Sequence, residues 1–243
     1  MKRSNKLSVS VIFLIFAFIL TSCGKSSNAN VMIKIPGQNF EMSKTEVTQG
    51  LYKSVMGENP SKFKGANNPV ETVSWYDAIY FCNKLSVVKG YEPVYSVDGN
   101  TDITKWDYTP HQENSIEGEI TQNTSANGYR LPTVEEWEYA AIGGQYYTYA
   151  GSNEIDEVAW YEENSNDKTH PVAQKKENGY GLYDMSGNVF EWCWDSCYDD
   201  RYYCGGSWDF YGGSCEVSFS YNYYACAYCR DYGIGFRIIR SVK

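Results

Sequence analysis

The sequence predicts a single loop-rich domain that combines short helices with short strands. Three segments each begin with a Thr or Ser and continue as a run with one apolar face, which is how capped helices start. Short alternating apolar runs end at Pro-Gly or Gly-rich turns, as strands do. No internal repeat and no second linker interrupts the chain, so one compact domain over residues 31–243 is the economical interpretation.

The first part of this domain is predicted to hold one strand and two helices. Residues 31–40 start as a run in which side-chain polarity alternates, and this run breaks at Pro36-Gly37, which indicates a strand that enters a turn. Thr48 is expected to cap a helix over residues 49–56. Ser74 is expected to cap the next helix, with Asp77 three residues on. The face of that helix expected to be buried consists of Ala78, Phe81, Cys82 and Leu85.

The middle of the chain is predicted to be mostly loop. Residues 94–97 form a candidate strand, and residues 98–127 are polar enough to indicate a long surface loop with at most one short hairpin. Thr133 and Glu136 form a capping box for a third helix, whose buried face would carry Trp137, Ala140 and Ala141. Residues 178–192 are dense in Gly, Asn and aromatic residues and indicate turns.

Charge and composition exclude several classes of function. The formal net charge of the 243-residue chain is -9, and no basic block occurs. Nucleic acid is therefore not an expected partner, since phosphate neutralisation needs a stripe of Lys and Arg. The chain has two histidines, His111 and His170, which leaves little room for a Ser-His-Asp triad or a His-rich metal centre.

The N-terminus reads as a targeting segment. Three basic residues precede an apolar run over residues 7–20 that is short for a membrane span. The run ends in Leu-Thr-Ser-Cys, which resembles a bacterial lipobox, so residues 1–22 are expected to be a lipoprotein signal peptide. Cys23 would then be lipidated and residues 23–30 would be a flexible tether, with the protein exported and membrane-anchored at the cell surface or outer membrane. The alternative is an ordinary cleavable signal.

Seven cysteines follow Cys23, an odd number for an exported chain. Cys82 lies on the expected helix face as a buried thiol. The others are clustered near the C-terminus: Cys193, Cys197, Cys204, Cys215, Cys226 and Cys229. A disulfide framework normally spreads through a domain, so this clustering favours surface variation. A zinc site at two of the closely spaced pairs is the alternative.

Residues 196–233, called the tail below, have an unusual composition. The tail contains no Lys, Gln or Met, one Glu and one Trp. These five residue types are the ones that a codon ending in C or T does not encode, whereas Tyr, Ser, Asp, Gly, Cys, Phe and Ala arise from an Asn codon by changes at its two adenines. Tyr offers stiff amphipathic contact area, and Ser, Gly and Asn offer adaptable hydrogen bonds, as in antibody binding loops. The tail is therefore predicted to be a diversified binding surface.

Several long motifs, in order, resemble the formylglycine-generating enzyme (sulfatase-modifying factor) family. The resemblance implies an α+β, C-type-lectin-like fold that is loop-rich, with two main helices and small antiparallel sheets. The motifs are Glu46-Val47-Thr48, Asn68-Pro69-Val70-Glu71 with Val73-Ser74-Trp75-Tyr76-Asp77-Ala78, Gly128-Tyr129-Arg130-Leu131-Pro132-Thr133 with Glu136-Trp137-Glu138, Asn178-Gly179-Tyr180-Gly181-Leu182-Tyr183-Asp184-Met185 with Gly187-Asn188-Val189 and Glu191-Trp192, Gly205-Gly206-Ser207-Trp208, and Gly235-Phe236-Arg237.

Enzymes of this family oxidise a substrate cysteine with copper held by two cysteines. The resemblance places the second of these positions on Cys215 and the first on Phe210. One thiolate does not make the two-thiolate site that Cu(I) favours. The chain is therefore expected to be no enzyme, with no catalytic residues and no required cofactor. A formylglycine-generating, sulfatase-activating oxidase or a related metal-dependent enzyme is the alternative.

The resemblance also implies a structural calcium site. It would use the side chains of Asp184 and Glu191 and the backbone carbonyls of Gly187 and Val189, which are hard oxygen ligands. A second family site looks degraded, because its carboxylate position falls on Ala173.

Within the family, the tail is similar to the variable proteins of diversity-generating retroelements, which display adenine-directed variation at the C-terminus. The likeness implies a monomeric, surface-displayed binding protein for a protein or glycan ligand; a structural accessory domain is a third possibility. Trp208 and Arg237 would belong to the scaffold. The residues expected to vary and to bind ligand are Tyr203, Cys204, Asp209, Phe210, Tyr211, Phe219, Tyr221, Asn222, Tyr223, Tyr224, Cys226, Tyr228, Cys229, Asp231 and Tyr232.

Overall fold

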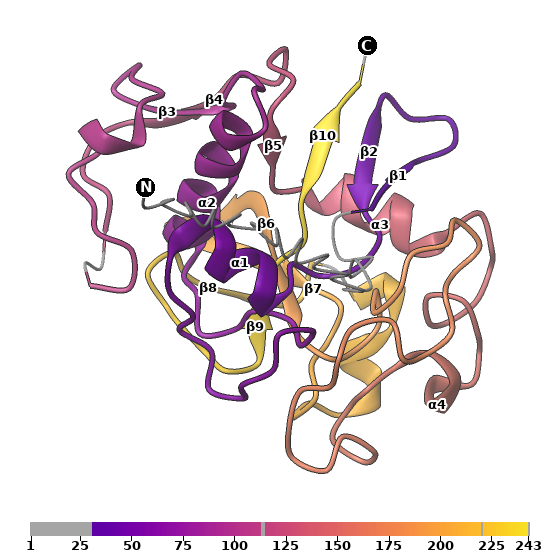
Figure 1. Ribbon diagram of the computed structural model, residues 1–243. Coiled ribbons are helices and arrows are strands. Elements are labelled where there is room, and N and C mark those ends of the chain that lie inside the picture. Colours follow the sequence, from indigo (N-terminus) through magenta and orange to yellow (C-terminus); the bar gives the residue numbers. More distant parts are fainter. Residues whose placement is uncertain (1–30, 113–114, 220, 243) are drawn as a thin grey trace, which may run out of the picture.

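The computed structural model describes residues 31–112, 115–219 and 221–242. The expected signal peptide, Cys23 and the tether lie outside the described residues. Within them, three small sheets and four α-helices are joined by long loops (Figure 1). Helices α1 and α2 lie on one side of the molecule and α3 on the other; β5, β6 and β10 lie between them, and β3 and β4 lie on the outer side of α2 (Figure 1).

The first sheet joins the two ends of the described chain. Its strand order is β1-β2-β10-β5, with β1 at Met32–Lys34, β2 at Phe40–Ser43, β10 at Ile239–Ser241 and β5 at Tyr129–Arg130. All three pairings are antiparallel, and Ile239 lies opposite both Met42 and Arg130. The last strand of the chain is therefore an inner strand, flanked by segments from the beginning and the middle of the sequence.

The predicted helix starts are confirmed. Helices α1 (Gln49–Met56), α2 (Trp75–Val88) and α3 (Val134–Ile142) begin after Thr48, Ser74 and Thr133, and each of these side chains accepts a hydrogen bond from a backbone N–H of the first turn. Ser74 and Thr133 form complete capping boxes with Asp77 and Glu136. Helix α4 is a single short turn, Ile155–Val158.

Residues 98–127 contain one strand of a short hairpin, as the prediction allowed, and the rest of the segment is more ordered than the predicted surface loop. Strand β3 (Tyr95–Val97) pairs with β4 (Ile120–Gln122) as a hairpin, and a 3-10 turn, Ile103–Lys105, lies between them. Trp106 is 1% exposed, and its ring lies edge-on to Tyr80 of α2 at 6.0 Å. The sequence did not predict these contacts, because single aromatic residues in a polar segment produce no periodic apolar pattern.

The third sheet carries the tail, and its strands were not predicted from the sequence. Its order is β8-β7-β6-β9, with β6 at Phe190–Cys197, β7 at Asp200–Cys204, β8 at Tyr224–Cys226 and β9 at Ile234–Gly235. The β6–β7 register shifts between Trp192 and Ser196, which breaks the alternation that would have marked a strand. Short 3-10 turns at Gly212–Cys215 and Val217–Phe219 complete this region.

Two large clusters of buried side chains hold the sheets and helices together. One surrounds α1 and α2 and includes Trp75 and Trp192, and the other lies beneath α3 and includes Trp137. The Arg237 guanidinium is fully buried and forms an ion pair with Glu191 at 2.6 Å, which confirms the expected scaffold role of Arg237. No helix in the three described ranges is long and apolar enough to span a membrane.

Candidate functional site

The tail connects β6 and β9, which are neighbouring strands of the third sheet. Strand β6 leads into it, and β9 leaves it by pairing in parallel with β6, with Phe190 opposite Ile234. The hairpin of β6 and β7 and the pairing of β7 with β8 support the segments between. Both ends of the tail are thereby held on the same rigid sheet, which is the arrangement expected for binding loops on a scaffold.

The predicted binding residues fall into three classes of exposure. Cys204 is buried. Half-buried members are Tyr203, Asp209, Phe210, Phe219, Tyr223, Cys226 and Cys229. Exposed members are Tyr211, Tyr221, Asn222, Tyr224, Tyr228, Asp231 and Tyr232. Four of the exposed tyrosines, at positions 211, 221, 224 and 228, leave 50% to 55% of their surface open, so their rings are available for contact without any rearrangement.

The half-buried aromatic residues form a packed cluster with Phe190 of β6. The ring of Phe190 lies 5.0 Å from Phe210, 4.8 Å from Tyr203 and 5.0 Å from Tyr223, all between ring centroids. Such tilted and edge-to-face pairs stabilise a fold beyond simple burial. Tyr223 is thus part of the tail's support, whereas Tyr221 and Tyr224 flank it on the surface against the edge of Tyr202.

Above this cluster lies a cavity of about 300 Å³, called the tail pocket below. Its wall contains three aromatic rings, two carboxylates and one guanidinium. The lining residues are Phe190, Tyr203, Asp209, Phe210, Ala225, Cys229, Arg230, Asp231, Gly233 and Ile234. Five of them are among the predicted binding residues, so the structure brings one third of the predicted set together around a single hollow.

An anchoring network beneath the tail pocket was not predicted as part of the site. Arg230 donates from Nε to Oδ2 of Asp77 at 2.9 Å, and the hydroxyl of Tyr108 donates to Oδ1 of Asp77 at 2.7 Å. His111 Nδ1 lies 3.3 Å from Oδ2 of the same carboxylate. Hydrogen bonds from His111 and Arg230 outweigh burial and hold the pKa of Asp77 below its usual range. Asp77 was expected only as a capping residue, and its second role depends on segments distant in sequence.

The structure changes the interpretation of three cysteines, Cys204, Cys226 and Cys229. Cys226 and Cys229 are joined in a disulfide, so neither thiolate is left for the zinc alternative, and the described residues contain no group of three or more His, Cys, Asp or Glu side chains that could hold a metal ion. Cys204 is 1% exposed, with its sulfur 3.7 Å from that of Cys193. Cys204 is therefore a core thiol beneath the sheet, and its prediction as a ligand contact was wrong.

The two positions that the resemblance assigned to copper ligands hold one thiol and one aromatic ring. Cys215 is buried, and desolvation raises the pKa of its thiol to about 12. Phe210 belongs to the aromatic cluster of the tail pocket. A buried thiol of this pKa stays protonated at neutral pH, and the thiolate is the form that binds metal.

The turn expected to bind calcium is buried and rich in oxygen. Asp184 adopts a left-handed backbone (φ 56°) and accepts from the N–H of Ala173 through Oδ2, at 2.7 Å. Glu191 accepts from Trp137 and Arg237 through Oε2, both at 2.6 Å. Oδ1 of Asp184 and Oε1 of Glu191 are buried and without a hydrogen-bond partner among the described residues. One orphaned carboxylate oxygen on the turn and one at the start of β6 fit the hard donor set of a calcium ion.

Burial makes this turn electrostatically costly. Desolvation raises the pKa of Asp184 to about 6. Glu46 was not predicted for this site, although it opens one of the family motifs. Its carboxylate accepts from the Val189 N–H at 3.2 Å and from the Asn188 amide at 2.9 Å, and burial also raises its pKa. Asn164 matches the other residue of the second calcium site that the resemblance implies, and its amide donates to Asp156 at 3.0 Å.

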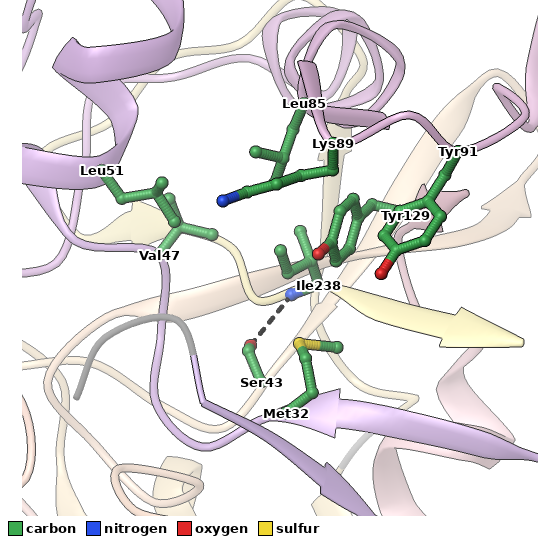
Figure 2. A pocket seen from close by; sticks show the side chains of 9 residues that line it. All are labelled: Met32, Ser43, Val47, Leu51, Leu85, Lys89, Tyr91, Tyr129 and Ile238. Carbon is green, nitrogen blue, oxygen red and sulfur yellow. Dashed lines mark hydrogen bonds between the residues drawn. The ribbon is translucent and has the colours of Figure 1, made fainter. Parts of the chain in front are cut away.

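Two other hollows lie away from the tail pocket. One, of about 210 Å³, separates α1 and α2 from the first sheet; Figure 2 shows Val47 and Leu51 on one side of it and Tyr91 and Tyr129 on the other. Its Ser43 hydroxyl is engaged by the N–H of Ile238 (Figure 2). The other, of about 360 Å³, is lined by the cationic residues Lys64 and Lys168 together with His170. Neither is lined by a residue of the tail.

Comparison with known proteins places the chain in a family. The model of the sulfatase-modifying factor enzyme 1-like domain (FGE-sulfatase) matches residues 18–242. The chain belongs to this family. Its α+β fold is that of the family, as predicted from the motifs.

Two solved structures and one curated relative match this FGE-sulfatase chain along most of its length. The Treponema denticola variable protein 1 is 35% identical with a TM-score of 0.77, over 87% of this chain and 92% of that one. CarF is 30% identical with a TM-score of 0.70, over 88% and 94%. The chaperone protein LppX of Paenibacillus barcinonensis is 38% identical over 280 residues, 95% of this chain and 98% of that protein. The expected likeness to a variable protein is confirmed.

Proposed function

We propose that the protein is a non-enzymatic, surface-displayed binding lipoprotein whose tail carries ligand specificity and is diversified by adenine-directed retroelement variation. The observation that carries this proposal is the group of half-exposed tyrosines in a tail whose two ends are held by one sheet, four of them with 50% to 55% of their surface open. Aromatic side chains of this kind supply most of the free energy at protein interfaces. The likeness to the Treponema denticola variable protein 1 supports the same conclusion.

The construction of the tail also suits diversification. The tail is supported by the ring of Phe190, which packs on Phe210, and by the ion pair between Asp77 and Arg230. Phe190 and Asp77 both lie outside the tail. Side chains that point outward can therefore change while the scaffold keeps its contacts. Changes confined to rigidly supported loops alter specificity without refolding the domain.

Sequencing the 3′ end of the gene and its flanking DNA in a cell population tests the proposal. We expect varied codons at the exposed tail positions, and a nearby near-copy that differs from the tail almost only where the copy has adenine. The varied codons would then map the binding surface. An invariant tail with no such copy would refute diversification.

The oxidase alternative has a separate test. It requires Cys215 to ionise and a second soft ligand to approach it, although burial raises the pKa of this thiol to about 12. We expect no stoichiometric Cu(I) binding after anaerobic reconstitution of the protein. Tight binding of one copper ion that disappears in Cys215→Ser would instead support the enzyme.

The relative named a chaperone favours a second version of the binding function, in which the ligand is a client protein. Its likeness extends over 95% of this chain, including the tail. In that case the protein should suppress the aggregation of an unfolded exported protein at near-stoichiometric ratio. The Tyr221→Ser/Tyr224→Ser variant should lose this effect while remaining folded.

We also propose that the turn of Asp184 and Glu191 holds a structural calcium ion, with backbone carbonyls of Gly187 and Val189 as further ligands. The orphaned oxygens Oδ1 of Asp184 and Oε1 of Glu191 support this. Bound calcium would offset the mutual repulsion of these carboxylates and stiffen the entry to β6.

A further inference from the structure

We propose that the tail pocket binds a positively charged side chain, so that the ligand is a protein presenting an exposed Arg or Lys. This inference rests on the proposed binding function and names the chemistry of its ligand. It follows from the walls, the charge and the anchoring of the pocket.

The walls of the tail pocket suit a cation. Phe190, Tyr203 and Phe210 contribute rings, with Phe190 and Phe210 edge-to-face at 5.0 Å. The negative face of an aromatic ring attracts an ammonium or guanidinium group within about 6 Å of its centre. The volume of about 300 Å³ is sufficient for one long side chain and is too small for an extended oligosaccharide.

Two carboxylates face the same point of the tail pocket. A β-carbon placed on Gly233 would lie 2.9 Å from Oδ1 of Asp209 and 3.3 Å from Oδ1 of Asp231. Each Oδ1 accepts one local hydrogen bond, from the Ser207 hydroxyl at 2.6 Å and from the Gly233 N–H at 2.7 Å. Neither carboxylate forms an ion pair within the part of the chain that the structure describes. The second oxygen of each remains available to a donor from the ligand.

The arginine in the wall does not cancel this negative charge. Arg230 donates to both carboxylate oxygens of Asp77, at 2.9 Å and 3.4 Å, and to the Tyr108 hydroxyl at 3.1 Å. Its positive charge is therefore matched by a buried carboxylate behind the wall. With Arg230 and Asp77 offsetting each other, Asp209 and Asp231 leave the tail pocket with an excess of negative charge.

The shape and the charge together exclude other ligand chemistries. An anionic group would meet two carboxylates in a chain whose net charge is already -9. Lysine side chains line the two separate hollows described above, Lys89 in one and Lys64 with Lys168 in the other. A guanidinium satisfies the tail pocket best, because it stacks on rings and donates several hydrogen bonds in one plane.

Amide NMR of the 15N-labelled full chain in detergent tests this inference. The probes are Nα-acetyl-arginine amide and Nα-acetyl-lysine amide. Their uncharged counterparts are Nα-acetyl-citrulline amide and Nα-acetyl-norleucine amide, and methyl α-glucoside represents a neutral glycan. We expect the cationic probes to shift the amide signals of Phe210, Ala225 and Gly233, with the arginine probe binding more tightly. The binding should weaken as salt is added.

The double variant Asp209→Asn/Asp231→Asn should bind the arginine probe at least tenfold more weakly, with its remaining spectrum unchanged. Asp199→Asn, which alters an exposed carboxylate on the β6–β7 turn outside the pocket, is the matched control and should bind as the parent does. The single variants Asp209→Asn and Asp231→Asn replace the double variant if it fails to fold.

Three outcomes overturn the inference: equal binding of the citrulline probe, no shift of the pocket signals with either cation, or shifts produced by the glucoside alone. The last outcome would point to a glycan ligand. These results are separable from the proposed function. An invariant tail would refute diversification and leave the titration intact, whereas a silent pocket beside tyrosine-dependent ligand capture would refute only the inference.

Discussion

Tyr221, Tyr223 and Tyr224 are neighbours of one residue type with two different roles. The ring of Tyr223 packs on Phe190 and Phe210, at 5.0 Å and 5.7 Å between centroids. Tyr221 and Tyr224 are about half exposed and lie edge-on to Tyr202. All three were predicted to vary and to bind ligand, and the structure leaves Tyr221 and Tyr224 exposed while it half-buries Tyr223.

Serine substitutions separate these roles. Tyr223→Ser should lower the free energy of unfolding by about 2 kcal/mol, because it empties part of a half-buried aromatic cluster. That loss corresponds to a fall in Tm of roughly 4–8 °C for a chain of this size. Tyr221→Ser and Tyr224→Ser should each stay within about 0.5 kcal/mol of the parent. Thermal unfolding followed by circular dichroism measures all three, and equal losses would show that the outer pair is also structural.

The carboxyl of Asp184 makes stability depend on pH in a defined direction. Burial raises its pKa to about 6 from the ordinary value of 3.8, so the folded chain binds more protons than the unfolded chain between these values. The resulting stability is fully present below pH 3.8 and is lost as the pH rises through about 6. The raised pKa of Glu46 acts in the same direction.

Calcium should reverse this loss where the carboxylates are ionised. We expect 1 mM Ca²⁺ — about a hundredfold excess over a 10 μM site — to raise Tm more at pH 7.5 than at pH 5, and to have little effect on Asp184→Asn. The same variant should flatten the fall in stability between pH 4 and pH 6, with Asp199→Asn as the surface control. An equal calcium effect in Asp184→Asn would place the ion elsewhere.

Among the helices, α2 makes a side-chain link to the tail, in addition to the sheet that holds the two ends of the tail. Its first turn presents Asp77, which accepts hydrogen bonds from the Ser74 N–H in the capping box and from Arg230 of the tail. His111 and Tyr108 reach the same carboxylate from the loop after β3. One buried acid thus links a helix start, a long loop and the tail.

Replacing Arg230 should lower the free energy of unfolding. Arg230→Met removes the guanidinium that pairs with the buried carboxylate of Asp77, and we expect a loss of about 3 kcal/mol in denaturant unfolding. The matched control is Arg240→Met, which breaks a partly exposed ion pair with Glu41 and should cost about 1 kcal/mol or less. Similar losses in both variants would mean that Arg230 acts as an ordinary surface cation.

The sequence predicted the helices better than the strands, for a physical reason. Helix starts are local: Thr48, Ser74 and Thr133 bond to the N–H groups of the turn that follows them. The strands of the third sheet depend on partners distant in sequence and on a register shift after Trp192. The burial of Cys204 against Cys193 is likewise a tertiary fact that no local pattern records. The family motifs located the turn of Asp184 and Glu191, yet only the structure adds Glu46 to it.

At the scale of the whole molecule, the domain is closed by the last strand of its chain. β10 lies between β2 and β5, with Ile239 opposite residues of both. An inner strand contributes two ladders of hydrogen bonds, so it has more effect on the sheet than an edge strand.

Truncation tests this closure. A chain ending at Ile238 should lose cooperative thermal unfolding, because β5 would lose its partner in the sheet and β2 would keep only its pairing with β1. Ile239→Val keeps both ladders and should cost about 1 kcal/mol. A truncated chain that still unfolds in one sharp transition would show that the first sheet forms without β10.

The position of β10 also sets an order of events during synthesis. The ribosome delivers the tail before it delivers Ile239–Ser241, so the first sheet is completed only after every tail residue has emerged. A tail sequence that displaces the segment between β9 and β10 would prevent β10 from pairing with β2 and β5, and the first sheet would not form completely. If the tail is diversified as we propose, completion of this sheet would retain only those tail sequences that are compatible with the scaffold.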